Sequence, residues 1–131
     1  MKTKSHSNKK VNLITLGCSK NLVDSENIIT QLRHGDWNAE HEQPDNAEVV
    51  IINTCGFIET AKQESVDTII QFAQAKSNKE IKKLYVTGCL SQRYRQELAN
   101  EIPEVDAWFG TLELPELLAK FDVDYKHELI G

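Results

Sequence analysis

Three short apolar runs, each leading into a cysteine, constrain the fold of this chain more than any other feature. The runs are "VNLITL" at 11–16, "EVVIIN" at 48–53 and "KLYVT" at 83–87. Short runs rich in β-branched or aromatic residues are typical of buried strands. After each run, a turn with glycine and cysteine leads into a stretch whose apolar residues recur every three to four positions, as in amphipathic helices. The chain is therefore expected to alternate strands with helices.

The same patterns give the expected order of elements. Helical stretches are expected at 22–33, 57–75 and 90–100. A weaker fourth strand at 105–109 and a short helix at 115–120 follow them. Alternating strands and helices predict right-handed crossovers and a parallel sheet with helices on both faces. We expect an α/β fold, a flavodoxin-like doubly wound sheet of about four or more strands. Residues 34–46 are expected to form a turn-rich connector.

The chain's 131 residues suit one domain. Residues 1–10 hold four lysines and lack the apolar core of a signal peptide, so we expect a poorly ordered basic lead-in. The domain is expected to occupy 11–120, and 121–131 to form a tail. No apolar run approaches the roughly 20 residues that cross a bilayer, so no membrane partner is expected and a cytoplasmic location is predicted.

The charge of the chain points away from nucleic acid. The formal net charge is −5, and the residues after the lysine-rich lead-in carry −9 once its four lysines are set aside. A phosphate backbone is bound by clustered lysine and arginine, so nucleic acid is not expected as a partner for this domain. An acidic surface suits a basic protein partner better.

The cysteines are Cys18, Cys55 and Cys89, each two residues after an expected strand. Neighbouring strands lie ~4.8 Å apart, so three adjacent parallel strands bring their end loops within roughly 10 Å of one another. Each thiol also precedes a helix N-terminus, whose positive end favours thiolate. A small buried residue is the ordinary explanation for one cysteine, but three equivalent positions favour a joint site.

Glycines and asparagines accompany these turns. Gly17, Gly56 and Gly88 each adjoin a cysteine and permit tight turns and close approach of the backbone to a bulky ligand. Asn21 and Asn53 flank the turns, where an amide bonds either a ligand or the loop backbone. These five are candidate pocket residues.

Three thiolates suit more than one ligand. A 4Fe–4S cluster held by three cysteines keeps one iron open, whereas a zinc site would be completed by water or histidine. His34, His41 and His127 do not adjoin a strand end, and His6 lies in the lead-in. The alternative hypothesis is a flavodoxin-like module that binds a phosphate-bearing ligand at the same edge, although the sequence contains no phosphate-binding motif.

Two acidic residues near the first cysteine are also candidates for a role in the site. Asp24 and Glu26 could be catalytic carboxylates, but both are expected in the first helical turn, where the helix dipole and solvation would explain them.

Three motifs, "LGCSKNLVDSE", "INTCGFIETAKQES" and "VTGCL", in this order resemble the N-terminal domain of the radical-SAM methylthiotransferases. The first resembles the branch that modifies a small-subunit ribosomal protein more than the tRNA-modifying branch, whose first cysteine has a "YGCQMN"-like context. The resemblance covers roughly Val11 to Lys120. Ser19 stands where many relatives would carry proline.

The resemblance implies an auxiliary 4Fe–4S cluster on Cys18, Cys55 and Cys89, whose open iron binds or delivers sulfur. It also implies a radical-SAM barrel with S-adenosylmethionine and a second cluster on a CxxxCxxC motif, and a TRAM domain that recognises substrate. The implied substrate is an aspartate of ribosomal protein S12, with tRNA as the alternative. Because the chain has no CxxxCxxC, it is expected to be an excised N-terminal domain that binds the auxiliary cluster without catalysing the reaction alone.

Overall fold

The computed structural model describes residues 9–17, 19–42, 47–55 and 59–126. Some expectations concern residues outside these ranges, namely Cys18, Gly56, His6, His127 and residues 1–8 of the lead-in. Within the described ranges, no helix combines the length and apolar character that a membrane span requires.

Five strands and four helices make up the described chain, and they alternate except where β3 follows β2. In order they are β1 (Lys10–Thr15), α1 (Ser19–His34), β2 (Asn38–His41), β3 (Val49–Thr54), α2 (Glu59–Ser77), β4 (Lys83–Gly88), α3 (Cys89–Glu101), β5 (Ala107–Trp108) and α4 (Leu114–Ala119). All the expected elements are present, and their ends lie within three residues of the predicted ones.

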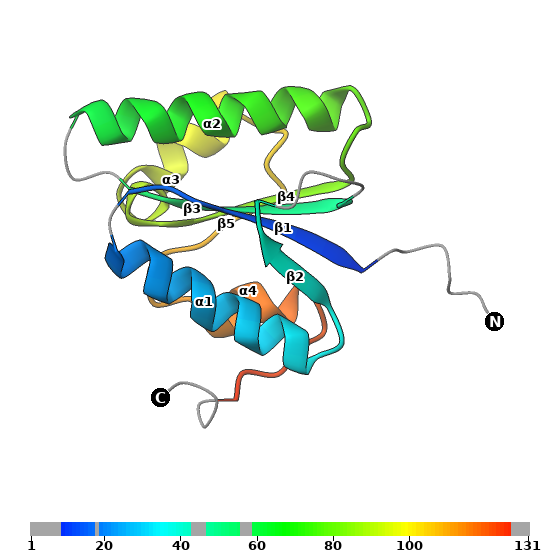
Figure 1. The fold of residues 1–131 in the computed structure, drawn as a ribbon. Helices are drawn as coiled ribbons and strands as arrows, with labels where there is room; N and C mark the ends of the chain where they lie inside the picture. The colour runs from blue at the N-terminus through cyan, green and yellow to red at the C-terminus, as the bar shows by residue number, and fades with distance from the viewer. Residues whose placement is uncertain (1–8, 18, 43–46, 56–58, 127–131) are drawn as a thin grey trace.

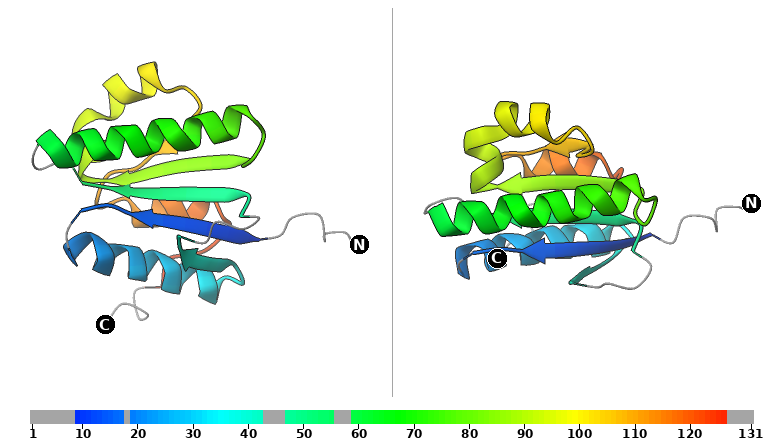
Figure 2. Two further views of the ribbon diagram at one scale, coloured as in Figure 1. Left: turned by 45° about the horizontal axis from the view of Figure 1, so that its top comes forward. Right: turned by 90° about the horizontal axis from the view of Figure 1, so that it is seen from above.

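The strands form one sheet in the order β2-β1-β3-β4-β5, and every pair is parallel. Figure 1 shows α2 and α3 on one face and α1 and α4 on the other. The prediction of a flavodoxin-like doubly wound sheet is therefore confirmed. Since all strands run the same way, the helices that follow β1, β3 and β4 begin on one side of the molecule, as Figure 2 shows.

One strand contradicts the sequence prediction. β2 lies within residues 34–46, which were expected to be a connector, and it pairs in parallel with β1. The prediction was wrong because "NAEH" has no apolar run, and only Ala39 of the four is buried. As an edge strand, β2 needs little more than backbone hydrogen bonds and one inward side chain.

The core has two halves separated by the sheet. All six residues of β3 are buried, and they alternate in direction as a strand requires. Val49 and Ile51 pack toward α1 and α4, whereas Val50 and Ile52 pack toward α2 and α3. This central strand is therefore fixed in register on both faces, which in turn fixes where its carboxyl end lies.

The segment after α4 packs onto the α1 face. Phe121 and Val123 are buried, and the indole N–H of Trp37 donates to the Phe121 carbonyl at 3.1 Å. The Gln31 side chain bonds both backbone groups of Lys126, at 2.8 and 2.9 Å. Residues 121–126 are thus part of the folded body.

Candidate functional site

The register of the sheet places two of the three cysteines side by side. Thr54 of β3 is the register partner of Gly88 of β4, and Cys55 and Cys89 are the residues that follow them. Cys55 is buried, and Cys89, the first residue of α3, is partly exposed. β1 is the other neighbour of β3. The three cysteine-bearing turns therefore follow adjacent strands at one edge of the sheet, and Cys18 itself lies outside the described residues.

Gly17 brings the turn after β1 against the Cys55 side chain. A Cβ at position 17 would overlap Cys55 Cβ and lie 2.7 Å from its Sγ, far inside van der Waals contact. Its φ of 97° is also one that only glycine adopts easily. The residue that follows Gly17 is Cys18, so this approach brings the first cysteine-bearing turn onto the second.

Gly88 allows the equivalent approach between the turns after β3 and β4. A Cβ here would lie 2.5 Å from the Thr54 carbonyl oxygen and 2.6 Å from Asn53 Oδ1. The φ of Gly88 is 100°, again in the left-handed region. Both described glycines of the candidate pocket thus make room for a neighbouring turn.

The two asparagines bond the loop backbone. Asn21 is 3% exposed, and its amide N–H groups donate to the Leu16 and Thr54 carbonyls at 2.6 and 2.8 Å. The Asn53 amide donates to the Asn21 carbonyl and to Ser25 Oγ, each at 3.0 Å. The start of α1 is thereby fastened to the ends of both β1 and β3.

A threonine adds the third strand to this network. The Thr54 hydroxyl donates to the Thr87 carbonyl at 2.6 Å, and so joins the ends of β3 and β4 within the buried layer. Buried polar groups of this kind stabilise one arrangement when all their partners are present. The ends of the three strands are thus held together by side-chain hydrogen bonds as well as by the sheet ladder.

Ser65 is a site residue that the sequence interpretation missed. Its hydroxyl, fully buried in α2, accepts from the Cys55 N–H at 3.1 Å and donates to the Cys55 carbonyl at 2.8 Å. The available signal was a polar residue in the otherwise apolar stripe of this helix. Another buried serine, Ser91 in the first turn of α3, has a hydroxyl with no hydrogen-bond partner among the described residues.

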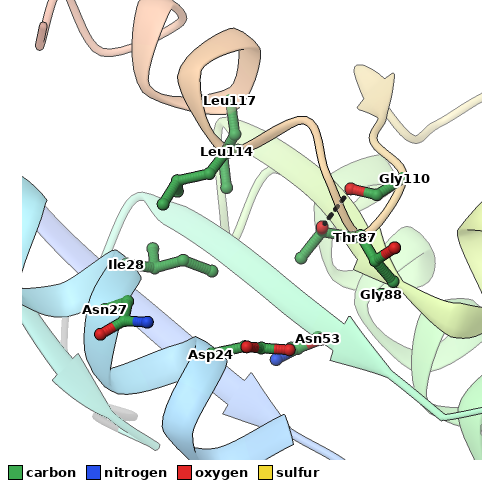
Figure 3. Close-up of a pocket in the computed structure, with 10 residues that line it drawn as sticks. Asp24, Asn27, Ile28, Asn53, Thr87, Gly88, Gly110, Leu114 and Leu117 are labelled. Atoms are coloured by element: carbon green, nitrogen blue, oxygen red, sulfur yellow. Dashed lines mark hydrogen bonds between the residues drawn. The ribbon is translucent and has the colours of Figure 1, made fainter. Parts of the chain in front are cut away.

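A small pocket lies beneath this edge on the α1 and α4 face (Figure 3). Polar and apolar residues line it: Asp24, Asn27, Ile28, Asn53, Thr87, Gly88, Gly110, Thr111, Leu114 and Leu117. Its volume is about 60 Å³, whereas pockets for cofactor-sized molecules measure roughly 300–1,000 Å³. Asp24 therefore borders a space suited to a few waters, and Glu26 is exposed on the surface of α1. The prediction that both lie in the first helical turn was wrong, because α1 begins at Ser19 and has no acidic residue in its first turn.

The loop that borders this pocket opposite α1 is held by Glu113. Its carboxylate accepts the Gly110 N–H at 2.6 Å and pairs with the Arg95 guanidinium. The Gly110 N–H first, and Arg95 second, lower the pKa of Glu113 below its ordinary value. The far wall of the pocket is thus tied to α3.

The remaining candidate ligands lie away from the cysteine turns. Among residues 9–17, 19–42, 47–55 and 59–126 no three histidine, cysteine or acidic side chains converge as a metal-binding group. His34 ends α1, far along the helix from Asn21, and His41 ends β2, which β1 separates from β3. A metal at this edge would therefore depend on the thiols.

Comparison with known proteins places the chain in a family. The sequence model of the uncharacterized protein family UPF0004 matches residues 10–110. A ribosomal protein uS12 methylthiotransferase RimO from Cytophaga hutchinsonii is 61% identical across the whole chain, which covers 30% of that relative. RimO proteins from Christiangramia forsetii and Flavobacterium psychrophilum are 52% and 53% identical, again across the whole chain and over 29% and 30% of the relatives.

These matches confirm the resemblance to the methylthiotransferases and to their ribosomal-protein branch. The chain spans about 30% of the length of these relatives and corresponds to their N-terminal part. It therefore belongs to the UPF0004 family, and over its whole length it is similar to the N-terminal domain of RimO.

Proposed function

We propose that this chain is the cluster-binding domain of a methylthiotransferase that modifies ribosomal protein uS12. Cys18, Cys55 and Cys89 would hold a 4Fe–4S cluster at the carboxyl edge of the sheet. The names of the relatives support the reaction and the substrate, and the three thiols support the cluster, because iron–sulfur clusters are held by cysteine thiolates.

The pairing of Thr54 with Gly88 is the observation that carries this proposal. It sets Cys55 and Cys89 at equivalent places on neighbouring strands, ~4.8 Å apart in the hydrogen-bonding direction. The close approach of Gly17 to Cys55 brings the turn after β1 to the same place. Cys55 and Cys89 offer sulfur ligands at this edge, and thiolates suit a soft sulfide-rich group better than a hard cation.

When bound, a cluster with three protein ligands supplies an iron with an open position, at which a sulfur atom can be held for transfer. The residues of this chain would hold and orient that group. The cysteines would ligate it, Gly17 and Gly88 would let the turns approach, and Asn21, Asn53 and Thr54 would fix the backbone. The buried layer beneath would keep bulk water from the protein side of the site.

The rest of the reaction belongs to other parts of a full-length enzyme. With three cysteines and no CxxxCxxC, this chain would not hold the second cluster or cleave S-adenosylmethionine. We assign those tasks to a radical-SAM domain, and substrate recognition to a TRAM domain, of the same full-length chain in the cytoplasm. The net charge of −5 suits a basic ribosomal protein as substrate.

Anaerobic reconstitution with iron and sulfide tests the cluster. We expect about four irons and four sulfides per chain and broad absorbance at roughly 400 nm. The variant with all three cysteines changed to alanine should bind neither. Equal iron uptake by that variant, or about one colourless zinc per chain in the native protein, would overturn the assignment.

The substrate needs a separate test with the full-length enzyme that contains this domain. Incubation with S-adenosylmethionine, reductant and purified uS12 should add one methylthio group to an aspartate, detected by peptide mass spectrometry. The same enzyme should leave tRNA unmodified. Modification of tRNA but not of uS12 would move the protein to the tRNA-modifying branch.

A further inference from the structure

The backbone of Cys55 is held by Ser65, which lies ten residues later in the chain. The Ser65 hydroxyl accepts the Cys55 N–H at 3.1 Å and donates to the Cys55 carbonyl at 2.8 Å. One side chain therefore satisfies both polar groups of a single buried residue. A serine within a helix often bonds the carbonyl four residues before it, whereas Ser65 reaches out of α2 to the turn.

The burial of Ser65 makes this contact costly to lose. The residue has no exposed surface, and Cys55 is 6% exposed. A buried N–H or carbonyl that loses its partner pays the full desolvation penalty of that group. Replacement of Ser65 by alanine would leave two such groups unpaired in the Cys55 turn, so the turn would rearrange or open to reach water.

Contacts from the other face complete the hold on this turn. Asn21 of α1 donates to the Thr54 carbonyl, the peptide oxygen just before Cys55, at 2.8 Å. Gly17 lies against the Cys55 side chain itself. The direction in which Sγ leaves the turn is thus fixed from α1, from α2 and from the turn after β1.

We propose that Ser65 is a positioning residue for the metal centre: it fixes the backbone of Cys55 so that the thiolate is directed into the three-cysteine site before metal binds. The role in metal binding rests on the function proposed above. The hold on Cys55 does not, because both hydrogen bonds are made by the protein alone.

The first test uses metal-free protein. Alkylation of Cys55 by iodoacetamide, followed by peptide mass spectrometry, should be about tenfold faster in Ser65→Ala, because the loss of two hydrogen bonds favours the opened turn. The matched control is Thr68→Ala, which removes another α2 hydroxyl, bonded to the Glu64 carbonyl. That control should stay within about twofold of the native rate. An unchanged rate in a folded Ser65→Ala protein would overturn the proposal.

A second measurement needs no substitution and so holds even if Ser65→Ala fails to fold. In the metal-free native protein, hydrogen exchange at the Cys55 amide should be protected to the level of the β3 amides, since its N–H is bonded inside the core. Exchange at the rate of an exposed loop would contradict the hold by Ser65.

A third measurement connects Ser65 to the metal. After reconstitution, Ser65→Ala should release iron to a chelator about tenfold faster than the native protein, and Ser65→Thr, which keeps the hydroxyl, should restore slow release. Equal release from all three would overturn the positioning role. If native protein takes up no iron at all, the proposed function fails, whereas the alkylation and exchange results would still report the hold on Cys55.

Discussion

At the scale of single residues, the site depends on positions where a side chain is absent. Gly17 and Gly88 let three turns approach more closely than any other residue type permits. Their importance was predictable, because glycine next to each cysteine is visible in the sequence. Ser65 was not predictable in this role, since a serine in a helix gives no indication of a partner ten residues away.

Substitution of Gly17 by alanine should strongly reduce metal uptake. The new methyl group would overlap the Cys55 side chain, and the φ of 97° would add strain. We expect iron uptake to fall at least tenfold and the free energy of unfolding to drop by about 2 kcal/mol. Gly35→Ala is the control: its Cβ would meet Val123 2.5 Å away, so stability should fall while iron uptake persists. Normal uptake in Gly17→Ala would refute the close approach.

Substitution of Ser91 by alanine should stabilise the protein. The Ser91 hydroxyl is buried and has no hydrogen-bond partner within the described residues. Its removal eliminates the desolvation cost of the hydroxyl and places a better helix former in α3. We therefore expect the free energy of unfolding, measured by urea denaturation, to rise by about 1 kcal/mol. A loss of stability instead would show that the hydroxyl has a partner, such as a bound water.

At the scale of elements, strand and helix patterns predicted everything except β2. The apolar runs of β1, β3 and β4 are visible because both faces of these strands are buried. β2 contributes one buried side chain, and its place at the edge is decided by tertiary pairing with β1 rather than by its own residues. The adjacency of β1, β3 and β4 involves only the three visible strands, so the common edge of the turns that follow them could be predicted and the full sheet could not.

The loop between β5 and α4 should lose support in acid. The pKa of Glu113 is lowered by the Gly110 N–H and then by Arg95. A carboxylate whose pKa is lower in the folded than in the unfolded protein stabilises the fold at pH values above its unfolded pKa, here about 4.5. That stabilisation is lost as the pH falls through the folded pKa. Glu113→Gln should therefore melt below the native protein at pH 7, and the difference should shrink below about pH 4.5. Arg95→Ala should show a smaller difference in melting temperature that shrinks over the same pH range, since the Gly110 N–H, the larger cause of the lowered Glu113 pKa, remains.

A difference between Glu113→Gln and native protein that stays constant from pH 7 to pH 3 would show that the carboxylate does not stabilise this loop by its charge. Thermal unfolding followed by circular dichroism across that range provides the measurement.

At the scale of the whole molecule, the segment after α4 closes the α1 face. The sequence after Lys120 has no regular pattern, so it was predicted to be a tail. The burial of Phe121 and Val123 could not be foreseen, because two apolar residues without periodicity do not indicate which surface they will cover.

Truncation should reveal this dependence. A chain ending at Lys120 loses Phe121, Val123 and the bonds between Gln31 and Lys126. We expect a loss of about 4 kcal/mol in the free energy of unfolding, a large part of the roughly 5–15 kcal/mol of a typical domain. A chain ending at Lys126 keeps every one of these contacts and should be more stable than the chain ending at Lys120 by about the same amount. Equal stability of both truncations would contradict the docking of 121–126.

The all-parallel order of the strands also sets when the thiols can act together. Each crossover must close before its strand pairs, so Cys55 and Cys89 become neighbours only once β4 has joined β3. During synthesis, at least seventy residues must be added after Cys18 before all three cysteines are present in the chain. A metal bound as proposed by all three thiols would therefore bind only after β1, β3 and β4 have paired, and its binding would then stabilise the folded chain.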